Sequence, residues 1–96
     1  MNRDSEMLRL HIFISGRVQG VGFRNFIRTK AEELNLTGWI KNLEDGRVEA
    51  VFAGRENKVK EISAAVQTGP SLARVDNVDS KQEEYVDEFD KFRIVF

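Results

Sequence analysis

The fold is decided by residues 8–34, which read LRLHIFISGRVQGVGFRNFIRTKAEEL. Apolar and polar side chains alternate as far as Ser15, and this period of two is typical of a half-buried strand. From Phe23 to Leu34 the apolar positions recur at spacings of three and four, which is typical of a helix with one buried face. A glycine-rich stretch lies between the two patterns, so a short loop joins the strand to the helix.

Farther along the chain, the same two kinds of pattern predict a hairpin, a second helix and two more strands. Asp45-Gly46 supplies the positive φ angles that a tight hairpin turn needs, and Gly69-Pro70 stops the second helix. The expected strands span residues 37–43, 47–53, 74–79 and 92–96, the second helix begins at Gly54, and residues 82–90 form an acidic loop.

The resulting order is β-α-β-β-α-β with a short C-terminal strand, which predicts an α+β fold of the ferredoxin-like kind. In that plan an antiparallel sheet carries two helices on one face. A chain of 96 residues is expected to form a single domain, over residues 1–96, with residues 1–7 as a flexible tail. Because this plan hosts enzymes, metal carriers and RNA-binding proteins alike, the fold alone does not indicate a function.

The composition excludes several kinds of chemistry. The chain has 15 Lys and Arg against 16 Asp and Glu, no cysteine and one histidine, His11. Without cysteine there are no disulfides, thiolate zinc sites or cysteine nucleophiles, and one histidine argues against a metal cluster or a Ser-His triad. The near-zero net charge argues against binding nucleic acid by bulk charge. Since no apolar run approaches the ~20 residues of a membrane span and no signal-peptide core is present, we expect a cytoplasmic protein without membrane contact.

The charges are unevenly placed along the chain. Residues 1–30 contain six basic and two acidic side chains, whereas residues 76–90 contain seven acidic side chains and one basic. Two interpretations stay open at this point. These are two solvated surfaces of opposite sign, or a local anion-binding site in the first third of the chain.

The glycine-rich loop, residues 16–22, favours the second interpretation. Successive backbone N–H groups in such a loop can bind an anion, and the start of the helix adds unpartnered N–H groups and the positive end of a dipole. The loop is neither a Walker A sequence nor a dinucleotide fingerprint, because Asn25 stands where the latter has its third glycine. Arg24 lies in the first turn, where a cation opposes the dipole by roughly 0.3–1 kcal/mol. A bound anion would offset this conflict, and the alternative is a solvent-facing arginine without a role.

A second candidate group, Asn42, lies near the end of the strand at 37–43. In the ferredoxin-like plan the first two strands point the same way, and the third strand lies between them. Asn42 is therefore expected two strand spacings, about 10 Å, from the glycine-rich loop. Its carboxamide could hold a water molecule aimed at the bound anion. Equally, Asn42 could cap the hairpin turn that follows it.

The residues near the loop include no evident nucleophile or base. An enzyme with this set would act by positioning and charge stabilisation, which suits phosphoryl transfer. A phosphoanhydride needs no general acid for its leaving group, so an activated phosphate is the expected type of substrate.

Three blocks of sequence carry a resemblance to a known family. They are GRVQGVGFR at residues 16–24, GWIKN at 38–42 and DGRVE at 45–49, and they are followed by Gly69-Pro70, ARV at 73–75 and FRI at 92–94. In this order they resemble the acylphosphatase family, over residues 8–96.

The resemblance implies hydrolysis of the carboxyl–phosphate bond of small acylphosphates, with no metal or other cofactor. Arg24 would bind the phosphate and Asn42 would orient the attacking water. The phosphate-binding backbone would come from Gln19, Gly20, Val21, Gly22, Phe23 and Arg24. Inorganic phosphate would be both product and competitive inhibitor, and the protein would act as a monomer.

Two alternatives are kept. Acylphosphatase-like domains also begin a large hydrogenase-maturation protein that handles carbamoyl phosphate. The other alternative is a non-catalytic ferredoxin-like binding module, such as an RNA-recognition domain. That domain needs exposed aromatic side chains on its first and third strands, and residues 47–53 contain only Phe52. We therefore expect no nucleic-acid partner.

Overall fold

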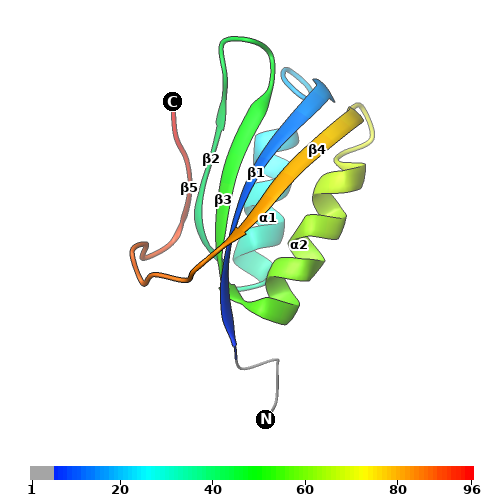
Figure 1. Ribbon diagram of the computed structural model, residues 1–96. Helices are drawn as coiled ribbons and strands as arrows, with labels where there is room; N and C mark the ends of the chain where they lie inside the picture. Colours follow the sequence, from blue (N-terminus) through cyan, green and yellow to red (C-terminus); the bar gives the residue numbers. More distant parts are fainter. Residues whose placement is uncertain (1–5) are drawn as a thin grey trace.

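The computed structural model describes residues 6–96 as a five-stranded sheet with both helices on one face (Figure 1). The predicted order of elements is confirmed. The elements are β1 (Met7–Arg17), α1 (Phe23–Glu33), β2 (Thr37–Asn42), β3 (Val48–Arg55), α2 (Glu56–Thr68), β4 (Arg74–Glu83) and β5 (Phe92–Ile94).

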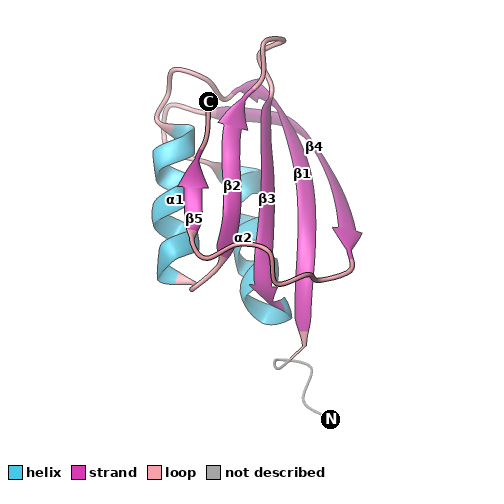
Figure 2. Cartoon of the chain, turned by 90° about the vertical axis from the view of Figure 1, so that its left-hand side faces the viewer, coloured by secondary structure: helices cyan, strands magenta, loops and turns pink. Residues whose placement is uncertain are grey.

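The strands lie in the order β4-β1-β3-β2-β5. All pairs are antiparallel except the last, since β5 runs parallel to β2. The sheet is therefore mixed, whereas the sequence patterns predicted an antiparallel one. The reason is the connection after β4, which crosses the face of the sheet opposite the helices, where Glu88 accepts a hydrogen bond from Arg9 of β1, and brings the chain back along the far side of β2 (Figure 2).

Several boundaries differ from the expected ones. Gly54 and Arg55, expected at the start of the second helix, are the last residues of β3, so α2 begins at Glu56, and β5 ends at Ile94 instead of residue 96. β4 continues to Glu83, because the long strand β1 offers it partners as far as Arg9. Residues 82 and 83, expected in the acidic loop, are therefore part of an edge strand. Met7, expected in the tail, is the first residue of β1 and pairs with Arg55. The rest of the expected tail, residues 1–5, lies outside the described residues.

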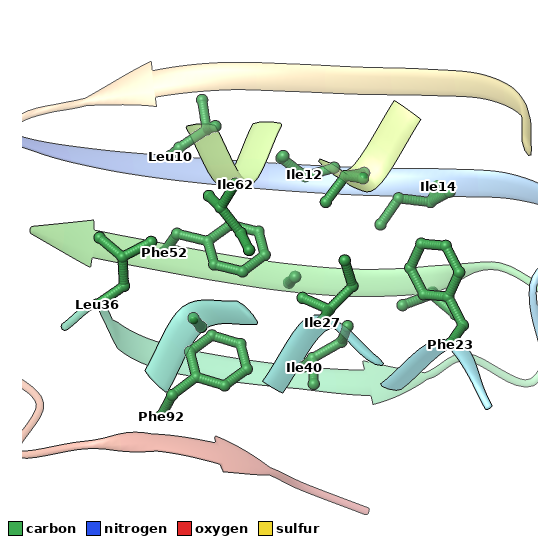
Figure 3. Close-up of a cluster of buried hydrophobic side chains, with 14 of the residues drawn as sticks. Leu10, Ile12, Ile14, Phe23, Ile27, Leu36, Ile40, Phe52, Ile62 and Phe92 are labelled. Atoms are coloured by element: carbon green, nitrogen blue, oxygen red, sulfur yellow. The ribbon is translucent and has the colours of Figure 1, made fainter. Parts of the chain in front are cut away.

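The core fills the space between the sheet and the two helices. Along β1 every second side chain is buried, and these side chains point toward the helices (Figure 3). The helix α2 contributes Val59, Ile62 and Val66, as its spacing predicted. On α1 Phe23 is fully buried, while Phe26 is half-buried against the core. Phe92 of β5 stacks on Phe52 of β3 with 5.3 Å between the ring centroids, which anchors the last strand.

The strand directions decide where a site can form. β1 and β2 point the same way because each pairs antiparallel with β3, which lies between them. The β1–α1 loop, the β2–β3 hairpin and the C-terminus therefore gather at one end of the sheet, opposite the start of β1 (Figure 1).

Candidate active site

The β1–α1 loop owes its shape to two glycines. Gly20 has φ 73° and Gly22 has φ 79°, a region that side chains other than glycine rarely adopt. A Cβ atom added at either position would meet no protein atom within 4 Å. The positive φ, and not crowding, therefore requires glycine here.

Backbone N–H groups of this loop and of the start of α1 are unpartnered. The N-cap Gly22 makes no side-chain cap, and the first helical hydrogen bond runs from Phe26 N–H to the Gly22 carbonyl. The N–H groups of the first turn before Phe26 have no carbonyl ahead of them in the helix. Among the described residues, no loop N–H group from 19 to 22 donates to another backbone group. The loop and the helix start thus offer several donors to a ligand.

A hollow of about 520 Å³ opens beside these groups. The structure brings five of the predicted site residues to its lining, from two distant segments: Gly20, Gly22, Phe23, Arg24 and Asn42. The side chains of Gln19 and Val21 do not line it; Val21 is buried in the core.

The hollow has a positive lining. Arg24 and Arg28 are its only charged lining residues, and no carboxylate of the described residues pairs with either. By contrast, Arg9, Arg47 and Arg74 each have an acidic partner. Since α1 has no acidic residue in its first turn, the charge of Arg24 adds to the helix dipole. The site therefore favours an anion.

Asn42 is the last residue of β2, and its side-chain oxygen lacks a hydrogen bond within residues 6–96. Its Oδ1 atom is buried and has no hydrogen-bond partner among the described residues. The Asx interaction of the following hairpin comes instead from Asp45, whose Oδ1 accepts from the Arg47 N–H at 3.1 Å. A buried acceptor without a partner is rare and calls for a ligand or a water. Of the two interpretations of Asn42, the hairpin cap is therefore the less favoured.

Gln19 connects the loop to the hairpin. Its Nε2 donates to the carbonyl oxygens of Leu43 at 2.8 Å and of Arg47 at 2.9 Å. These partners lie 24 and 28 positions away in the chain, and no local sequence pattern pointed to them. Because Leu43 follows Asn42, the two bonds also set how the Asn42 side chain stands relative to the loop.

Five residues of the lining were missed: Val18, Asn25, Arg28, Ile94 and Phe96. Arg28 could have been found, since it follows Arg24 at the spacing that puts two side chains on one helix face. Ile94 and Phe96 are there because β5 lies beside β2. The Phe96 ring centroid is 5.6 Å from Cζ of Arg24, within the range of a cation–π contact.

The open face of the sheet carries a different cluster. His11 lies next to Phe13 and Trp39, and its Nε2 is 2.7 Å from Oε2 of Glu49. The only aromatic residue of β3, Phe52, is fully buried on the opposite face. The first and third strands therefore do not provide the paired exposed aromatics on which RNA bases stack.

Fold and site together define an α+β protein with a positively charged hollow at one end of its sheet. Within residues 6–96, no three side chains of His, Cys, Asp or Glu gather in a way that could hold a metal ion. In the same range neither helix has the length and apolar character needed to cross a membrane.

Comparison with known proteins agrees with this class. The sequence model of the acylphosphatase family matches residues 10–94. An acylphosphatase from Roseiflexus is 48% identical over 91 residues, which cover 95% of this chain and 98% of that protein. The crystal structure of acylphosphatase from Bacillus subtilis superposes with a TM-score of 0.89 at 37% identity, covering 93% of this chain and 99% of that one. The chain belongs to the acylphosphatase family.

A larger protein is similar as well. The crystal structure of full-length HypF, in its phosphate- and nucleotide-bound form, matches at a TM-score of 0.83 and 29% identity; the match covers 95% of this chain and 12% of that one. Relatives named acylphosphatase are more similar in sequence, at 48% and 45% identity. The comparisons therefore favour an acylphosphatase enzyme over the two alternatives.

Proposed function

We propose that this protein hydrolyses small acylphosphates to a carboxylate and inorganic phosphate, with Arg24 and Asn42 as its catalytic residues. One observation carries the assignment of these two residues. Arg24, Asn42 and the loop glycines all line one hollow, and Oδ1 of Asn42 is buried without a hydrogen-bond partner among the described residues.

In the proposed reaction a water oxygen attacks phosphorus and forms a new P–O bond. The bond from phosphorus to the acyl oxygen breaks, the acyl group leaves as a carboxylate, and the water proton passes to phosphate or solvent. Asn42 Oδ1 accepts a hydrogen bond from this water and so fixes its direction of attack. Arg24 and the N–H groups of residues 19–24 stabilise the charge on the equatorial phosphoryl oxygens.

Because the leaving group is a carboxylate, the site needs no general acid to protonate it. A carboxylate is stable without a proton at neutral pH, so no side chain has to protonate it. Since Arg24 and the amides supply the positive charge, we propose that the reaction needs no metal ion.

The direct test is hydrolysis of benzoyl phosphate by the purified protein, with Arg24→Ala and a heat-inactivated sample alongside. We expect activity that the Arg24→Ala variant largely loses and that a chelator leaves unchanged. A wild-type rate equal to that of the heat-inactivated sample would exclude the proposed function.

Three finer points belong to the same proposal: phosphate binds the loop as a competitive inhibitor, the protein is a monomer, and it acts in the cytoplasm. The monomer is supported by the exposed large apolar side chains, which come from four separate segments: Met7, Leu72, Val86 and Phe96. Phosphate inhibition kinetics, size-exclusion chromatography and cell fractionation test the three points in turn.

A further inference from the structure

Arg28 is a second cation on the wall of the hollow. It lies four residues after Arg24 on α1, so the two side chains share one helix face about 6 Å apart along the axis. The Arg28 side chain donates to Asn25 Oδ1 at 3.0 Å through Nη2, and this bond uses a neutral acceptor. No carboxylate of the described residues forms an ion pair with Arg28, although Glu32, one helical turn farther along α1, lines the neighbouring depression with it.

The hollow continues beyond Arg28. A second depression, of about 300 Å³, runs on between α1 and β5 and shares Arg28 and Ile94 with the first. Lys91, Arg93 and Glu32 complete its polar lining. Arg28 thus stands where the phosphate end of the hollow meets its outer end.

The space available exceeds what a phosphate needs. About 520 Å³ falls within the range of about 300–1,000 Å³ that small-molecule sites occupy, so the acyl group can lie in the same hollow. With the phosphate at Arg24 and the loop, the acyl group has Ile94 and Phe96 on its apolar side and Arg28 on its polar side.

We propose that Arg28 binds a second anionic group on the acyl portion of the substrate. This rests on the proposed function, and it defines the substrate class as acylphosphates with a carboxylate or phosphate a few atoms from the acyl carbon. The separation of about 6 Å between Arg24 and Arg28 along α1 corresponds to such a short chain. An acylphosphate with a neutral chain would leave the Arg28 charge without a partner.

A matched pair of substrates tests this inference. Succinyl phosphate and butyryl phosphate have acyl chains of equal length, and only the first ends in a carboxylate. We expect wild-type kcat/KM to be about tenfold higher for succinyl phosphate, through a lower KM, because a charge-assisted hydrogen bond is worth a factor of about ten or more. In Arg28→Gln the ratio of the two kcat/KM values should fall to about one, and Arg28→Lys should keep part of the preference.

The ratio separates Arg28's effect on the acyl end from its effect on the phosphate, which both substrates carry. Lys30→Gln is the control, since it removes one positive charge from the same helix at a residue that does not line the hollow; it should keep the wild-type ratio. Higher salt should weaken the preference.

Each outcome decides between the proposals. Equal wild-type kcat/KM values, or a preference that survives in Arg28→Gln, would overturn the role of Arg28 while butyryl phosphate hydrolysis still supports the proposed function. If the wild type hydrolyses neither compound, the proposed function is wrong and the role of Arg28 falls with it.

Discussion

Gln19 and Leu43 are 24 positions apart in the chain, yet the Gln19 Nε2 atom donates to the Leu43 carbonyl oxygen at 2.8 Å. The same nitrogen donates to the Arg47 carbonyl at 2.9 Å, so one carboxamide holds both ends of the hairpin turn. Leu43 is also bonded to Arg47 through its own N–H, at 2.8 Å. The β1–α1 loop and the hairpin that follows Asn42 are therefore one connected unit.

Replacing Gln19 with Met tests this connection. The variant keeps a side chain of similar length but loses both donors, so we expect about 1–3 kcal/mol less unfolding free energy. We also expect kcat to fall about tenfold, because small misplacement of the attacking water is costly, while phosphate inhibition changes little. Urea denaturation and steady-state kinetics measure the two effects. Gln67→Met, on the exposed face of α2, is the matched control, and equal effects in both variants would exclude the connection.

Arg24→Ala should lose substrate binding and turnover together. Arg24 lies in the first turn of α1, directly after the loop, and removal of a single such donor costs on the order of 10²–10³ in rate. Inorganic phosphate should no longer compete at concentrations that inhibit the wild type. Arg55→Ala removes an arginine at the opposite end of the sheet and should leave both properties at wild-type values.

Asn42→Ala should separate activity from stability. The Oδ1 atom has no partner within residues 6–96, so its removal breaks no hydrogen bond in that part of the chain, and the unfolding free energy should not fall by the usual amount. Turnover should drop about 10²-fold because the attacking water loses its acceptor, whereas the phosphate inhibition constant should stay within about a factor of three.

Asn57 offers a matched control for this experiment. It lies on α2 and also has a buried Oδ1 without a partner among the described residues, but it does not line the hollow. Asn57→Ala should therefore keep full turnover. An Asn42→Ala variant with wild-type kcat would refute the water-positioning role.

The hairpin contributes a pH-dependent part of the stability. The Arg47 backbone N–H, and then its side chain, hold the pKa of Asp45 below its usual value of 3.8. A carboxyl whose pKa is lower in the folded state stabilises the fold above its unfolded pKa, and this stabilisation is lost as pH falls through the folded pKa. The difference in unfolding free energy between wild type and Asp45→Asn should thus shrink between about pH 5 and pH 2, and urea titrations at both ends measure it. If the difference in unfolding free energy did not change with pH, the ionised Asp45 carboxylate would not be the source of the stabilisation.

Much of the fold could be predicted because periodicity reports burial directly. The alternation along β1 and the three-and-four spacing on α2 both come from one buried face, and both elements form where expected. β4 was harder, since most of its side chains are exposed and its length is set by pairing with β1. The parallel direction of β5 depends on the route of the preceding connection, about which the three residues of the strand contain no information.

The site residues also divide into those that the local sequence predicts and those that depend on contacts between distant segments. Arg24 stood out because a basic residue at a helix start breaks a local rule, and the glycines stood out because positive φ is a local property. Asn42 required an argument from topology, and its sequence did not distinguish a hairpin cap from a water ligand. The partners of Gln19 and the wall formed by Ile94 and Phe96 depend on contacts between distant segments, which only the folded chain brings together.

The last strand gives the two ends of the hollow unequal rigidity. β5 is three residues long, and the bonds from Gly38 N–H to the Lys91 carbonyl and from Val95 N–H to the Ile40 carbonyl flank it. Phe92 is held in the core, whereas Phe96 is fully exposed. Such a segment frays at a smaller free-energy cost than the central strands, one of which leads into the β1–α1 loop. The wall that β5 forms can therefore yield to bound molecules of different bulk while the loop at the other wall keeps its geometry.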